Sequence, residues 1–267
     1  MSSALARLTL IPIVAGLALP LQARQDDAER LIALARQALG GEANLSNVRS
    51  FTIDARGHAL KGSSNSWSKF TIAVEFPDKF VRTNEGTSGG LRVPLSPSPA
   101  TAGGYLTSSL GAGSALGFNG DHAIAEGLFS PDDYRDFDGV WRPFIYPQRE
   151  LDEKYLERAR IGALPWLLGI FAQPMPGVPA RLEAATGAGA ATTVIVTGGG
   201  SARPRTLTFD PLSHLPASFD GTTFEDYRNI GPVRVPFRLR SSVGVQEITA
   251  IHINVTISPK RFRLSGR

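Results

Sequence analysis

The chain has 267 residues, a formal net charge of +4 and no cysteine. Without cysteine it can hold no disulfide bond, no thiolate metal site and no lipid attached through a cysteine. Its arginines are scattered rather than gathered in a run and no nucleic-acid-binding signature is present, so the composition also argues against a nucleic-acid partner.

The first 23 residues have the order of a secretory signal peptide. Arg7 precedes an apolar stretch from Leu8 to Leu21, and Ala23 is the small residue before the expected cleavage point. Two prolines interrupt this stretch, which is too short to cross a hydrocarbon core of roughly 30 Å as a helix. We therefore predict an exported, periplasmic protein whose mature part, residues 24–267, is a single domain.

A helix is expected at the start of the mature chain, over residues 26–39. Asp26 and Asp27 would lie at its N-terminus, where the helix dipole favours anions, and Gly40-Gly41 would end it. Its apolar residues recur at helical spacing: Ala28, Leu31, Ile32, Ala35 and Leu39.

Alternation of apolar and polar residues predicts strands from Ser50 onward. The segments 51–55, 70–76 and 79–85 come first. Six more follow from about Val178 to the C-terminus, separated by turns such as "GGGSARP" and "NIGP", which is typical of an antiparallel meander.

Two segments between these groups of strands have a different character. In residues 88–117 the composition changes: of the 22 residues from 96 to 117, eighteen are Gly, Ser, Pro, Ala or Thr, which predicts a flexible loop insertion. Residues 147–171 form a second helical region, in which Pro165 is expected to turn the chain. The pattern as a whole indicates an α+β fold, mainly an antiparallel sheet that curls around helices.

No motif has the context that catalysis or metal binding requires. Ser88 in "GTSGG" matches the Gly-x-Ser-x-Gly pattern of a serine hydrolase, but the "LRVPLSPSP" that follows cannot form the required helix. The acidic segment 132–139 fails as an EF-hand loop at its first and last ligand positions. The four histidines show no pair at ligand spacing, so we expect no metal and no cofactor.

Apolar surface at regular spacing is the feature that remains. In "VRVPFRLR" every second residue from Val233 to Leu239 is apolar, and three of the positions between them or just after them are arginine. Such alternation places the apolar residues on one face of a strand and the arginines on the other. The pattern suits either the inside of an ordinary sheet or the wall of a ligand cavity.

Several phrases of the sequence, in their order, resemble a known family. They are "LGGEANLSNVRSF" at the end of the opening helix, "KFTIAVEFPDKFVR", "FDPLSHLPASF", "TTFEDYRNIGPVRVPFRLR" and "ITAIHINVTISPKRF". Together they resemble the outer-membrane lipoprotein-sorting (LolA/LolB-like) superfamily, nearest to poorly characterised relatives in soil-dwelling bacteria. The resemblance implies an incomplete, strongly curved antiparallel β-barrel with an N-terminal helix and a central helical lid on the concave side.

The resemblance also implies where a ligand would lie, because well-known members of the family hold lipoprotein acyl chains in the concave cavity. Here one set of apolar residues would form the cavity wall and a second set the lid. The wall would consist of Phe70, Ile72, Val74, Phe76, Val233, Val235, Phe237, Leu239, Ile251 and Ile253. The lid would consist of Leu164, Trp166, Leu167, Leu168, Ile170 and Phe171.

Three hypotheses about function follow. The first is a periplasmic binding protein, without catalysis, for a lipid or acylated ligand, with at most transient contact with a membrane surface. The second is an envelope interaction or stress-sensing module with a protein partner, which a filled core without a cavity would favour. The third and least supported is a serine hydrolase that uses Ser88.

Overall fold

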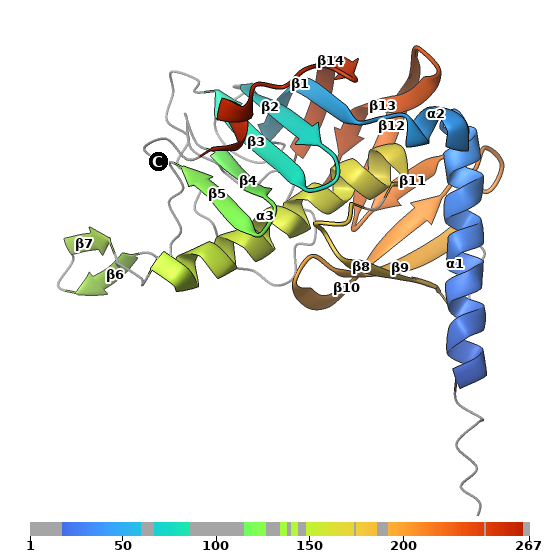
Figure 1. The fold of residues 1–267 in the computed structure, drawn as a ribbon, viewed down its shortest axis with the longest axis horizontal. Helices are drawn as coiled ribbons and strands as arrows, with labels where there is room; N and C mark the ends of the chain where they lie inside the picture. Colours follow the sequence, from blue (N-terminus) through green and yellow to red (C-terminus); the bar gives the residue numbers. More distant parts are fainter. Residues whose placement is uncertain are drawn as a thin grey trace, which may run out of the picture.

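A computed structural model gives the fold of the chain (Figure 1). One antiparallel sheet of 12 strands curves around a long helix, and a second long helix lies beside one edge strand. The structure describes residues 18–59, 67–85, 115–126, 134–137, 140–143, 148–173, 175–185, 192–242 and 244–263.

The helices are α1 (Ala18–Ala38), α2 (Glu42–Ser46) and α3 (Gln148–Phe171), followed near the C-terminus by a short 3-10 helix (Pro259–Phe262). The strands in the first part of the chain are β1 (Ser50–Ala59), β2 (Ser68–Glu75), β3 (Lys79–Glu85), β4 (Ala115–Asn119), β5 (His122–Glu126), β6 (Tyr134–Phe137) and β7 (Val140–Pro143). The strands after α3 are β8 (Ala180–Ala184), β9 (Thr193–Gly198), β10 (Ser201–Phe209), β11 (Pro216–Phe219), β12 (Thr222–Ile230), β13 (Val233–Arg240) and β14 (Gly244–Ile253).

Two meanders make up the large sheet. Its strand order is β5-β4-β3-β2-β1-β14-β13-β12-β11-β10-β9-β8, and β6 pairs with β7 in a separate hairpin. Every neighbouring pair in the large sheet is consecutive along the chain except β1 and β14, where Phe51 lies opposite Ile253. The sheet is not closed, since β5 and β8 remain its edges, and the predicted incomplete, curved barrel is confirmed.

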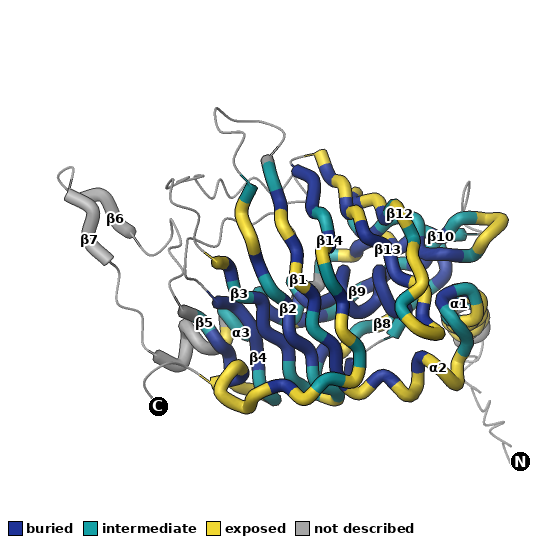
Figure 2. The backbone as a smooth tube through the Cα atoms, turned by 90° about the horizontal axis from the view of Figure 1, so that it is seen from above, coloured by how far each residue is buried: buried dark blue, intermediate teal, exposed yellow. Residues whose placement is uncertain are grey.

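The sheet buries its concave face. Buried segments of β1 to β4 lie side by side (Figure 2). In β1, Phe51 and Ile53 are fully buried, whereas Asp54 and Arg56 are exposed on the outer side. Buried residues of this face form one apolar cluster with those of α1 and α3. A smaller cluster on the outer side of β2 to β5 packs under Phe262 in the C-terminal segment.

The two long helices differ from the sequence prediction. α1 begins at Ala18 rather than at Asp26, because most of the intervening residues are good helix formers and Pro20 lies in the first turn, where no N–H is needed. α3 is continuous through Pro165, so the predicted turn of the chain there is wrong. Residues on both sides of this proline are buried, and their packing offsets the one missing backbone hydrogen bond.

The predicted loop insertion is too long at its C-terminal end. Ala115, Leu116 and Gly117 lie in β4, where they pair with β3 and β5. This short strand is buried on both faces, so it shows no alternation, and it follows a long Gly/Ser-rich run whose composition it shares. The rest of the insertion, residues 88–114, lies outside the described residues.

Candidate functional site

The concave face gathers the ten residues that the sequence predicts for a cavity wall. All of them belong to the main apolar cluster or pack against it. Eight are buried, with exposed fractions between 0% and 7%, and Phe76 and Ile253 are partly buried. They come from β2, β13 and β14 and from the residue just after β2, so the meeting of the two meanders brings them onto one surface.

Helix α3 covers this surface. It contacts β3, β4 and β5 in one meander and β10, β11 and β13 in the other, so it spans both halves of the sheet (Figure 1). All six residues predicted for a lid are at most 1% exposed. Trp166 meets Phe70 of β2 edge-on, with ring centroids 6.0 Å apart, and Phe171 packs on Phe51 of β1 at 4.6 Å. The predicted wall and the predicted lid are therefore in direct contact.

The approach of α3 to the sheet is closest at Gly169. A Cβ atom on this residue would lie 2.1 Å from Cζ of Phe224 on β12, so any larger residue would force the Phe224 ring or α3 to shift. Gly162, about two helical turns earlier, has no atom within 4 Å of the corresponding position. The C-terminal half of α3 is thus tightly packed, whereas the helix is open on the side of Gly162.

Polar contacts hold α3 at two further places. Arg160 donates to Asp121 in the β4–β5 turn at 2.8 Å, and the Asp121 side chain is 92% exposed. At the C-terminal end, Ala172 has a φ of 46°, and its carbonyl oxygen accepts a hydrogen bond of 3.4 Å from Arg36 of α1. Arg36 also makes a two-point ion pair with Glu42 of α2. Side chains, rather than a shared backbone ladder, therefore attach α3 to the β4–β5 turn and to α1.

Several polar side chains are buried on the concave face, and three of them lie beside the predicted wall. Arg82 and Asn84 on β3 and Gln246 on β14 are buried, with exposed fractions of 8%, 7% and 3%. The guanidinium of Arg82 lies over the Phe70 ring, 4.1 Å from its centroid. Burial lowers the pKa of Arg82 to about 10, so Arg82 stays cationic at neutral pH. Sequence reasoning missed this cation, although "KFVRTNE" places Arg82 at strand spacing from Phe80.

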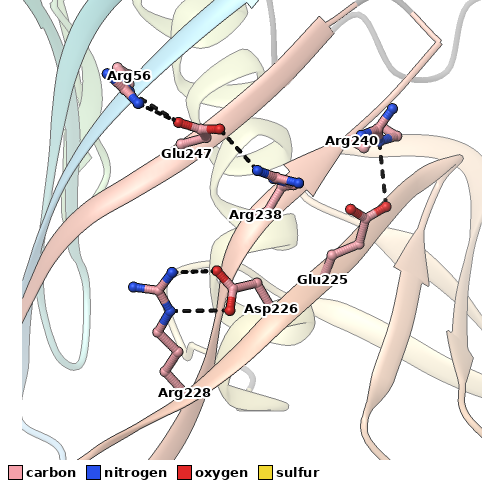
Figure 3. Close-up of polar contacts among 7 residues, drawn as sticks. All are labelled: Arg56, Glu225, Asp226, Arg228, Arg238, Arg240 and Glu247. Atoms are coloured by element: carbon pink, nitrogen blue, oxygen red, sulfur yellow. Dashed lines mark hydrogen bonds and ion pairs between the residues drawn. The ribbon is translucent and has the colours of Figure 1, made fainter.

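The outer face carries a row of charged residues across six neighbouring strands. In register, the row runs through Glu85, Lys69, Arg56, Glu247, Arg238 and Glu225. Glu247 pairs with Arg56 at 2.7 Å and with Arg238 at 3.2 Å (Figure 3). The hydrogen bond from Arg56 is the main reason that the pKa of Glu247 is lowered. These pairs tie together β1, β14 and β13, where the two meanders meet.

The described part of the chain offers little support for a metal site, a membrane-spanning helix or the other motifs singled out in the sequence. No group of three or more His, Cys, Asp or Glu residues there could hold a metal ion. None of the described helices is long and apolar enough to cross a membrane. Ser88 lies outside the described residues, as do 132, 133, 138 and 139 of the acidic segment, while residues 134–137 of that segment form β6.

Comparisons with known proteins give distant likenesses. No family model and no curated protein matches the chain. A LolA superfamily protein from Nitrosomonas europaea is 11% identical, with a TM-score of 0.36 over 88% of this chain and 97% of that one. A DUF1329 family protein from Desulfovibrio piger is 10% identical, with a TM-score of 0.41 over 91% and 97%. A chain of the MucA/MucB complex of Pseudomonas aeruginosa is 11% identical, with a TM-score of 0.28 over 90% of this chain and 60% of that one.

At these identities and TM-scores the likenesses carry no argument about function. The fold class rests on the sheet itself, and a nearer relation to proteins of soil-dwelling bacteria stays a prediction. Any functional conclusion has to come from the geometry of the concave face.

Proposed function

We propose that this chain is an exported, non-catalytic protein of the periplasm that binds an acyl chain of a lipid or acylated protein between the concave face and α3. The observation that carries the proposal is the arrangement of two apolar surfaces. One is a wall formed by strands of both meanders, and the other is a single helix that lies across it. Export, with cleavage after Ala23, belongs to the same proposal.

The way in which α3 is attached supports a displaceable cover. The backbone hydrogen bonds of an α-helix are made within the helix, so α3 can leave the sheet without breaking a strand ladder. Its departure would expose apolar side chains, which an acyl chain can cover again, since each buried methylene contributes roughly 0.8 kcal/mol. The ion pair of Arg160 and Asp121 adds little to closure, because the Asp121 side chain is 92% exposed, that of Arg160 19%, and ion pairs at the surface contribute about 0–1 kcal/mol.

The buried polar groups of the wall also support a binding role. Ligand sites are mostly apolar with a few placed polar groups that orient the ligand. Arg82, Asn84 and Gln246 fit this description, because they lie on the same face as the apolar wall residues. Arg, Asn and Gln side chains are mostly exposed in folded proteins, so their burial beside the wall is informative.

The second candidate is an envelope interaction module that binds a protein partner and no small ligand. Close packing favours it: Trp166 and Phe171 touch the sheet directly, and Gly169 lies against Phe224. In the conformation observed, α3 therefore occupies part of the concave face. If α3 never moves, the wall and lid residues are an ordinary core.

Two measurements on the full mature protein decide between these candidates. Native mass spectrometry after purification from a membrane-containing lysate should show a bound lipid-sized mass, and a fluorescent fatty acid should bind saturably. Phe237→Ala should weaken that binding. If no mass co-purifies, no probe binds, and Phe237→Ala loses about 3–5 kcal/mol of stability as in a packed core, acyl binding is refuted.

A further inference from the structure

β13 and β14 are paired over only part of their length. Their ladder joins residues 238–240 to residues 245–247. Beyond it, β14 continues along β1 and β13 runs along β12. Residues 233–237 and residues 248–253 are therefore neighbours in strand order that do not pair with each other. This unpaired stretch is named the seam.

Pro236 explains why the ladder stops. The N–H groups of alternate residues in a strand point to the same side. The N–H of Arg234 points away from β12, because it donates to the carbonyl of Leu39 at the end of α1 at 2.7 Å. The backbone nitrogen of residue 236 points in the same direction, toward β14. Because residue 236 is proline, it has no N–H to donate to β14. The end of α1 thus lies at one end of the seam, and the Arg238–Glu247 pair lies at the other.

Apolar residues of the concave face border the seam. Val235 and Phe237 on β13, and Ile248 and Ile251 on β14, are between 0% and 7% exposed and belong to the main apolar cluster. Above Phe237 lies the guanidinium of Arg228, 4.5 Å from the ring centroid. At the seam, the buried wall therefore comes next to a charged surface.

Positive charge exceeds negative charge around the seam. Arg228 is paired with Asp226, whereas Arg56 and Arg238 share the single carboxylate of Glu247 (Figure 3). The hydrogen bond from Arg228, and with it the charge of Arg238, lowers the pKa of Asp226, so three arginines share the two carboxylates of Glu247 and Asp226. An anion placed here would complete the pairing.

Arg234 adds a second excess charge. It is exposed, and it makes no ion pair with a carboxylate in the part of the chain that the structure describes. Its guanidinium lies 5.9 Å from the ring centroid of Tyr227, the residue opposite Pro236. This contact places the Arg234 guanidinium on the β12 side of β13, the strand that borders the seam, and leaves it exposed to a ligand.

We propose that the seam binds the anionic headgroup of the acyl ligand, while the chain passes Phe237 to reach the concave face. This proposal rests on the proposed function, because it assigns the polar end of the same ligand. A carboxylate and a phosphate satisfy the site equally well in chemistry, since arginine forms charge-assisted hydrogen bonds with both. An uncharged headgroup lacks this contribution.

The test compares three ligands with the same acyl chain: palmitate, palmitoyl lysophosphatidic acid and monopalmitoylglycerol. Each displaces a fluorescent fatty acid from the mature protein. The two anions should bind about tenfold more tightly than the neutral ester, the order expected for a hydrogen bond between charged groups. High salt should reduce this preference. Whichever anion binds more tightly identifies the source of the headgroup.

Arg234→Gln should remove most of the preference and leave the affinity for the neutral ester unchanged. The matched control is Arg181→Gln on the edge strand β8, where the arginine is 57% exposed and paired with Glu183. Pro236→Val tests the route of the chain, because it restores the N–H that would extend the ladder, and should slow association of all three ligands. Thermal unfolding checks that each variant is folded.

The outcomes separate this proposal from the one on which it rests. If the unaltered protein binds none of the three ligands, acyl binding itself is wrong. If it binds all three equally, or if Arg234→Gln and Arg181→Gln behave alike, the headgroup assignment is overturned and acyl binding stands. Unchanged association rates in Pro236→Val overturn the route through the seam.

Discussion

Phe70 of β2 receives Trp166 of α3 edge-on, with ring centroids 6.0 Å apart. The same ring lies under the buried guanidinium of Arg82, 4.1 Å from its centroid. The helix, the apolar wall and the buried cation therefore meet at one side chain. A ligand that occupies this part of the wall has to displace Trp166, so opening of α3 and binding are one event there.

Replacing Trp166 with Ala should test the two roles of its contact with Phe70, which are packing of the fold and covering of a ligand. We expect the free energy of unfolding in urea to fall by about 3–5 kcal/mol, because the atoms around the vacated space no longer have a packing partner. A bound fluorescent fatty acid should also dissociate faster, since the cover over its chain is reduced. Trp67→Ala is the control, because Trp67 is partly exposed and stacks on His58. Identical dissociation rates in wild type and Trp166→Ala would show that α3 is not the cover.

Two glycines of α3 should respond in opposite ways to alanine. Gly169→Ala places a methyl group 2.1 Å from Phe224, and the forced shift should destabilise the fold by about 1–3 kcal/mol. Gly162→Ala meets no atom within 4 Å and should be neutral or stabilising by up to about 1 kcal/mol, because alanine favours the helix. Urea denaturation measures both. Equal effects would contradict the close approach of α3 at Gly169.

Acid should weaken the contact between α1 and α2. Hydrogen bonds from Arg36 and Ser46 lower the pKa of Glu42 from 4.5 to about 2. A carboxyl group whose pKa is lower in the folded state stabilises the fold above its unfolded pKa, and that contribution is lost as the pH falls. The stability advantage of the wild type over Glu42→Gln should therefore be constant at neutral pH and shrink between pH 4.5 and about 2. Thermal unfolding of both proteins across this pH range measures this advantage. If the advantage does not change with pH, the ion pair of Glu42 with Arg36 is not its source.

Export predicts a defined N-terminus. The short apolar stretch before Ala23 should be removed, so that N-terminal sequencing of the periplasmic fraction begins at Arg24. Arg24 lies within α1, where it pairs with Glu183 of β8 at 3.4 Å, so the mature helix would start at a residue already held by the sheet. Recovery of an intact N-terminus only in membranes would contradict this prediction.

The local pattern of the sequence predicted nine of the described strands, the faces of those strands and the two long helical regions, but not β4 to β7 or β11. In β13, the alternation from Val233 to Leu239 predicted which residues are buried, because the period of two is a property of each strand alone. The apolar run around Trp166 likewise predicted a buried helix. The role of these residues as wall and lid came from the resemblance to a family, and it stays a proposal.

Only the tertiary structure decided how these faces meet. Pairing of Phe51 with Ile253 joins strands from opposite ends of the mature chain, and no local period encodes a partner so distant. The contact of Trp166 with Phe70, the burial of Arg82 on the same face, and the seam beside Pro236 all depend on that pairing. A strand pattern states which side is apolar, whereas the surface that covers it is set by the packing of the whole sheet around α3.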